Sequence, residues 1–124
     1  MSTDREEIDA FLTGCDDALL IYSALERLLE RLGPFETRVT RSQIAFRRKR
    51  GFAWVWVPGR YLHGNAAALV LSVALAGRDA SPRWKEVVQP APGRWMHHLE
   101  LHSPADIDGQ VLAWLQTAWQ QAGA

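Results

Sequence analysis

QIAFRRKRGFAWVWV, residues 43–57, is the stretch that decides the fold class. Two runs rich in Ile, Phe, Val and Trp, residues 43–49 and 52–57, are separated only by Arg50 and Gly51. Such runs are typical of β-strands. A connection this short joins antiparallel strands, because parallel neighbours need a crossover of a dozen or more residues. The stretch therefore predicts an antiparallel meander.

Segments on both sides of this hairpin complete the predicted architecture. Further strands are expected at 36–40, 68–75 and 94–101, and a short strand or turn at 84–88. Apolar residues at helical spacing predict helices at 4–13, 17–32 and 104–122, the last opened by Ser103, Pro104 and Asp106 as capping residues. We expect one α+β domain over residues 1–124, a two-layer sandwich in which an antiparallel sheet of about five strands is covered by N-terminal and C-terminal helices.

Composition narrows the class of protein further. The chain has 124 residues, of which 48% are hydrophobic and 23% charged, as in ordinary globular domains and unlike disordered or collagen-like chains. No run of about 18 apolar residues predicts a membrane span, and no secretory signal is visible in MSTDREEIDAF. Cys15 is the single cysteine and cannot form an internal disulfide, which favours the reducing cytoplasm.

The formal charge is balanced but unevenly distributed. The 14 Lys and Arg equal the 14 Asp and Glu, which argues against indiscriminate binding of nucleic acid. Residues 38–60 nevertheless contain seven basic residues and no acidic one. The middle of the chain can therefore form a local basic patch.

The tip of the hairpin combines cations with aromatic residues, a pattern that suits an anion site or a grip on single-stranded nucleic acid. Its structural interpretation is a solvated tip that protects an edge from aggregation. The residues concerned are Arg47, Arg48, Lys49, Arg50, Phe52, Trp54 and Trp56.

Strand alternation predicts that Phe52, Trp54 and Trp56 share one face. A two- or four-residue loop places these rings opposite residues 45, 47 and 49, which makes a ladder of cations and aromatic rings. A three-residue loop places them opposite residues 44 and 46, which makes an apolar face. The sequence leaves this register open.

Two adjacent histidines in RWMHHLEL, residues 94–101, are predicted to point to opposite faces. His97 shares its face with Trp95 and two leucines, so it should point into the protein, whereas His98 should point toward water. A buried imidazole must be neutral or paired. His97 is therefore the best candidate for a pocket residue or a general base, with a hydrogen-bonded core residue as the alternative.

A second group of candidates lies on the connection at 58–67, which carries Arg60, Tyr61 and His63. Apolar rings beside a few polar groups are what a ligand pocket or a docking patch needs. Metal-ligand spacings such as HExxH or paired CxxC are absent, and so are phosphate-loop and nucleophile-elbow patterns. We therefore expect no metal, no cofactor and no catalytic residue.

Three segments carry a resemblance to a known family. They are the hairpin FRRKRGFAWVWVP, the strand VLSVAL and the tail RWMHHLELHSPADIDGQVLAWLQTAW. Over roughly residues 15–122 the chain resembles the bacterial family catalogued as domain of unknown function 5655. The resemblance implies a small α+β domain without an agreed activity, and it implies family-like motif positions at Trp95, His97, Ser103, Pro104, Asp106 and Asp108.

These observations favour a non-enzymatic binding module for a small anionic ligand or a protein partner. It would use the 58–65 loop, the basic hairpin and the sheet face, as a monomer or as a homodimer formed through an exposed aromatic face. The first alternative is a nucleic-acid module built on Arg47, Arg48, Lys49, Arg50, Trp54 and Trp56. The second is an enzyme with His97 as general base, which requires a reaction partner near His97 in a cleft open to water.

Overall fold

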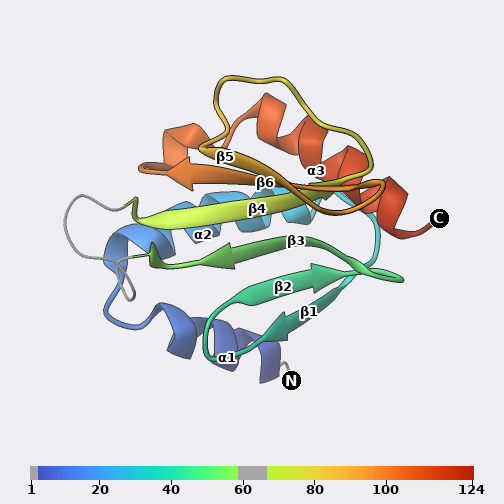
Figure 1. The fold of residues 1–124 in the computed structure, drawn as a ribbon. Helices are drawn as coiled ribbons and strands as arrows, with labels where there is room; N and C mark the ends of the chain where they lie inside the picture. Colours follow the sequence, from blue (N-terminus) through green and yellow to red (C-terminus); the bar gives the residue numbers. More distant parts are fainter. Residues whose placement is uncertain (1–2, 59–66) are drawn as a thin grey trace.

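A computed structural model describes residues 3–58 and 67–124 and shows an antiparallel sheet backed by helices (Figure 1). The sheet has six strands in the order β1-β2-β3-β4-β6-β5, and every neighbouring pair is antiparallel. The predicted α+β class is therefore confirmed. The strands are β1 (Glu36–Val39), β2 (Ile44–Arg47), β3 (Gly51–Trp56), β4 (Leu69–Leu75), β5 (Glu86–Ala91) and β6 (Arg94–Leu101).

The sheet has one strand more than the five or so predicted. The segment expected to be a short strand or turn at 84–88 forms β5, which pairs only with β6 and makes one edge of the sheet. An edge tolerates Pro90, which has no N–H to donate. Pro92 and Gly93 then make the turn into β6, and Gly93 takes a φ of 70°, a left-handed conformation that suits glycine.

Three helices pack on one side of the sheet: α1 (Thr3–Leu12), α2 (Asp16–Leu29) and α3 (Gly109–Ala122). Figure 1 shows α2 and α3 lying behind the strands, and the buried apolar residues of all three helices join those of the strands in one core. The predicted 17–32 helix ends three residues early at Leu29, where the chain changes to the tighter bonding of Arg31 N–H to Leu28 O and Leu32 N–H to Leu29 O.

The last helix begins at Gly109 and not at residue 104 as predicted. Pro104–Asp106 forms only a single 3₁₀ turn, η2, after which Ile107 is extended. Asp108 then acts as the N-cap, because its Oδ1 accepts a hydrogen bond from Val111 N–H at 3.1 Å. Ser103 is therefore an N-cap, but of the 3₁₀ turn and not of α3.

The β2–β3 hairpin takes the register in which Trp54 lies opposite Ala45. One prediction for this hairpin is wrong: Phe52 does not share a face with Trp54. The register shifts between Phe46 and Arg47, and Phe52 is the extra residue on β3, so it turns into the core with 0% exposure. Its ring lies 5.8 Å from that of Phe35, edge to face.

On the opposite side of the sheet lies no helix of residues 3–58 and 67–124. We call this side the open face. Strand pairing across it aligns Trp54 with Ser72, Ser72 with His98 and His98 with Glu86. The open face also carries Trp56, Val70, Ala74, Val88, Arg94, Met96 and Glu100.

None of the helices in the described ranges 3–58 and 67–124 is long and apolar enough to cross a membrane.

The bulge predicts a large effect for truncating Phe52. Because this ring is fully buried against Phe35 and Phe46, Phe52→Ala should lower the free energy of unfolding by about 3–5 kcal/mol. Leu20 is 60% exposed on α2, so Leu20→Ala is the control and should change it by less than about 0.5 kcal/mol. Urea denaturation measures both. Similar values for the two variants would contradict the bulge.

Candidate functional site

His97 lies in the core and is held by the main chain on both sides of its ring. Its side chain is 0% exposed. Its Nε2 accepts a hydrogen bond from Asp79 N–H at 2.9 Å, and its Nδ1 lies 3.3 Å from Val73 O. Since Nε2 accepts, the ring proton is on Nδ1 and is donated to that carbonyl. The predicted inward orientation is therefore confirmed. Because both nitrogens are engaged with the main chain, neither is left to take a proton from a substrate, and the geometry gives no support to a general-base role.

Asp79 extends this contact into the connection between β4 and β5. Its Oδ2 accepts from Trp84 Nε1 at 2.8 Å and from Ser81 N–H at 3.1 Å. Burial would raise the pKa of Asp79, but these hydrogen bonds stabilise the carboxylate and hold the pKa below its usual value. The Trp84 ring lies 4.9 Å from that of His97 and 4.0 Å from that of Trp114.

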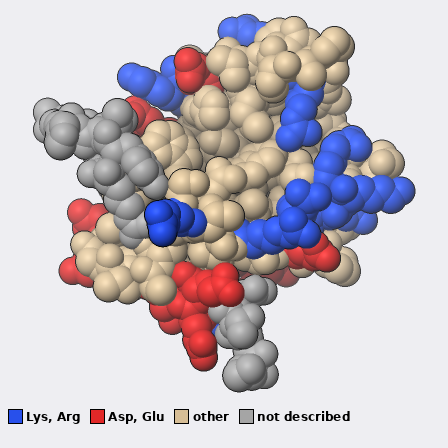
Figure 2. Space-filling view, turned by 60° about the horizontal axis from the view of Figure 1, so that its bottom comes forward, with Lys and Arg blue, Asp and Glu red and all other residues tan. Residues whose placement is uncertain are grey.

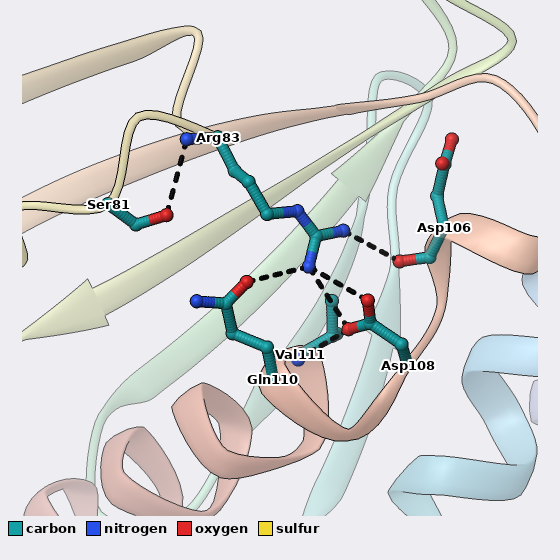
Figure 3. A network of polar contacts seen from close by, with 6 residues as sticks. All are labelled: Ser81, Arg83, Asp106, Asp108, Gln110 and Val111. Carbon is teal, nitrogen blue, oxygen red and sulfur yellow. Dashed lines mark hydrogen bonds and ion pairs between the residues drawn. The ribbon is translucent and has the colours of Figure 1, made fainter.

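Arg83 ties the same connection to the start of α3, as Figure 3 shows. Its Nη1 donates to both carboxylate oxygens of Asp108, at 3.1 and 3.0 Å, and to Gln110 Oε1 at 2.9 Å. Its Nη2 donates to Asp106 O at 3.0 Å. Burial opposes ionisation of Asp108, yet the Val111 N–H and the Arg83 guanidinium lower its pKa. We call the contacts of residues 79–84 with β6 and α3 the loop clamp.

The basic tip of the β2–β3 hairpin also has structural partners. Arg48 Nη1 donates to Trp119 O at 3.0 Å, and the guanidinium lies 3.7 Å from the centroid of the Trp119 ring. Arg50 Nη2 donates to Gln121 O at 2.6 Å, and the main-chain N–H of Lys49 donates to Ala122 O. These groups satisfy carbonyls at the C-terminal end of α3, where cations are favoured by the helix dipole.

The open face carries two partly exposed tryptophans. Trp54 and Trp56 are partly exposed there, two residues apart on β3. Two recesses lie on this face, one of about 210 Å³ whose charged lining residues are Lys85, Glu86 and Glu100, and one of about 270 Å³ that includes Met96. Trp56 and His98 line both recesses, whereas Trp54 lines only the larger.

His98 lies between the two recesses and is not among the site residues predicted from the sequence. Its Nδ1 lies 2.7 Å from Ser72 Oγ. Partial burial lowers its pKa, and the nearby Glu86 carboxylate opposes that shift. With Nδ1 beside Ser72, Nε2 is the ring nitrogen left to contact a ligand. Strand alternation predicts that His98 points outward, as observed. The sequence does not reveal its contact with Ser72, because Ser72 lies on a different strand.

Opposite charges lie at the two ends of the open face. Arg94 lies at the end formed by the β2–β3 and β5–β6 hairpins, with its guanidinium 5.8 Å from the Trp54 ring centroid. Glu100 lies farther along β6, and Glu86 lies opposite His98. Figure 2 shows Lys and Arg gathered on the right and an uncharged area beside them.

The other predicted residues contribute less. Trp95 is partly buried opposite Leu75. Arg60, Tyr61 and His63 lie outside the described residues, as does most of the 58–65 loop. Cys15 is partly buried and makes no disulfide. In residues 3–58 and 67–124, no group of three or more His, Cys, Asp or Glu could hold a metal ion.

Comparison with known proteins gives one match. The family model described as Domain of unknown function (DUF5655) matches residues 8–122. The search of curated proteins and the search of solved structures find no match.

The environment of His98 predicts its titration. In an NMR titration of the imidazole protons, the midpoint of His98 should lie below the ordinary value of about 6.5, because burial disfavours the imidazolium. Glu86→Gln removes a charge that favours the imidazolium, so the midpoint should fall further. Glu36→Gln, on the far edge strand β1, is the matched control and should leave it unchanged. A midpoint above 6.5, or an upward shift in Glu86→Gln, would contradict this environment.

Proposed function

The chain belongs to the family described as Domain of unknown function (DUF5655), and this membership assigns no activity. We therefore propose its function from the sheet face that no described helix covers. The proposal is a non-enzymatic binding module that docks a protein partner on the open face. The single observation that carries it is the pair of partly exposed tryptophans on a sheet face that no described helix covers.

The composition of this face supports a protein partner. Trp, Met and Arg are enriched in the centres of protein interfaces, and Trp and Arg contribute most to their binding energy. Here Trp54, Trp56 and Met96 form the apolar centre, Val88 is 40% exposed beside them, and Arg94 flanks them. Such a partly exposed apolar centre on a folded domain is typical of a docking surface.

Charge complementarity defines the chemistry of the partner. A carboxylate of the partner would face Arg94, a cation would face Glu86 and Glu100, and apolar side chains would cover Trp54 and Trp56. Neither Glu86 nor Glu100 forms an ion pair with another described residue. The proposed partner is therefore an amphipathic polypeptide with opposite charges at its two ends.

Two further parts of the sequence analysis belong to this proposal. A reducing compartment such as the cytoplasm is favoured by the single cysteine. A second copy of the chain is one partner with the required charge pattern, since a two-fold axis across the strands would place Arg94 of one copy near the acidic end of the other.

The nucleic-acid alternative has less support. Arg48 is engaged with a main-chain oxygen of α3 and lies over the Trp119 ring, and Glu86 and Glu100 bring negative charge to the face that carries the tryptophans. A nucleic-acid module of this kind would instead need its cations free to neutralise phosphates.

A displayed library of random 16-residue peptides, selected on the wild-type chain, tests the proposal. Selected peptides should combine apolar residues with one acidic and one basic end. Their affinity should fall at least tenfold for the Trp54→Ser/Trp56→Ser variant, because both aromatic anchors are lost. The control is Leu19→Ser/Leu20→Ser, which removes two exposed apolar side chains on α2 and should change affinity less than twofold.

Two other results would contradict the proposal or narrow it. Peptides that bind the tryptophan variant as tightly as the wild type would contradict the open face as the docking surface. Sedimentation equilibrium of the wild type and the tryptophan variant identifies the partner: a dimer that the variant abolishes would make that partner a second copy.

A further inference from the structure

A recess at the hairpin end of the sheet lies apart from the two recesses of the open face. Its volume is about 280 Å³. The β2–β3 tip, the end of β4, the β5–β6 turn and the last turns of α3 enclose it. Its lining includes several small residues, among them Gly51, Ala76, Gly93 and Ala118. A polyatomic ion therefore has room between these elements.

The charged residues that line this recess are all cationic. Arg50 comes from one hairpin and Arg94 from the other, and the lining contains no Asp or Glu. Neither arginine forms an ion pair with another residue in ranges 3–58 and 67–124. Two guanidinium groups that lack a carboxylate at the mouth of one recess are suited to an oxyanion, which they can bind through paired N–H groups.

Both arginines are held in place by neighbouring groups. Arg50 donates to Gln121 O at 2.6 Å, and the Oε1 of Gln121 in turn accepts from Ala76 N–H at 2.9 Å. The side-chain amide of Gln121 is thereby fixed with its NH₂ group still available as a donor. A pre-ordered set of donors lowers the entropy cost of binding an anion.

The Arg94 side is ordered by the tryptophan beneath it. The guanidinium lies 5.8 Å from the Trp54 ring centroid. The Trp54 ring itself lies over Gly51, so closely that a Cβ at this position would clash with Cζ2 of the ring. Glycine at this position therefore lets Trp54 lie under Arg94 at the edge of the recess.

We propose that this recess is a binding site for a small oxyanion, a phosphate group in the first instance, held by Arg50, Arg94 and the Gln121 amide. The site shares Arg94 with the docking surface proposed on the open face, whereas Arg50 and Gln121 belong to the recess alone. It also gives the basic hairpin a role narrower than nucleic-acid binding, because Arg48 takes no part in it.

The test is a titration of the ¹⁵N-labelled chain with inorganic phosphate at constant ionic strength, followed by amide shifts. Saturable shifts should centre on Gly51, Ala76 and Gly93. The dissociation constant should rise at least tenfold in Arg94→Gln and in Arg50→Gln. The matched control, Arg38→Gln, removes the same charge from an exposed position on β1 outside the recess and should change it less than twofold.

Further readouts keep the test decisive. Arg50→Gln could also destabilise the end of α3, which a fall in melting temperature would reveal. In that case the phosphate affinity of Arg94→Gln decides, because Arg94 forms no hydrogen bond to a helix in the described structure. Trp56→Ser should weaken the selected peptides and leave phosphate binding within twofold, which separates this site from the proposed function. Shifts that do not saturate, or an equal loss in Arg38→Gln, would overturn the proposal.

Discussion

The hydrogen bonds of the buried His97 ring are the constraint on which the rest of the structure depends. An imidazole in an apolar core costs about 1–3 kcal/mol for each polar atom left without a partner. The Asp79 N–H and the Val73 carbonyl supply both partners, so β4 and the following connection are fixed to β6. The Asp79 carboxylate in turn accepts a hydrogen bond from the Trp84 ring, and this ring packs on Trp114 of α3.

These contacts explain why the C-terminal tail, which carries the family resemblance, serves the stability of the fold. The tail RWMHHLELHSPADIDGQ supplies His97 to the loop clamp, Asp106 to the 3₁₀ turn and Asp108 to both the α3 cap and Arg83. These groups are engaged on the helix side of the sheet, whereas Trp54 and Trp56 stay partly exposed on the opposite side. The function proposed for the open face follows from this division of the sheet.

Local patterns predicted most of the fold, whereas long-range contacts determined what the patterns missed. Alternation in RWMHHLEL placed His97 inward and His98 outward correctly, because one buried face forces a period of two. The same rule failed at Phe52, since a bulge adds one residue that local propensity does not reveal. The helix start moved to Gly109 because Ile107 is extended, although Ser103, Pro104 and Asp106 all resemble a helix start.

The candidate site was less predictable for the same reason. Arg48 and Arg50 bond to residues 71 positions away on α3. The sequence around them therefore predicts a basic patch but not these contacts. His98 gains its role from Ser72 on another strand, and Arg94 from the ring of Trp54. The contacts of His98 with Ser72 and of Arg94 with Trp54 require the strand order β3-β4-β6, in which β6 is inserted between β4 and the edge strand β5.

Amide hydrogen exchange of Asp79 tests most directly the claim that His97 anchors the loop clamp. Its N–H lies in a connection between strands, where exchange is ordinarily fast. If it donates to His97 Nε2, it should exchange at least about 100-fold more slowly than the neighbouring amide of Arg78, approaching the rates of β4 and β6. Exchange as fast as that of Arg78 would contradict the anchor, and with it the account of the tail as a structural element.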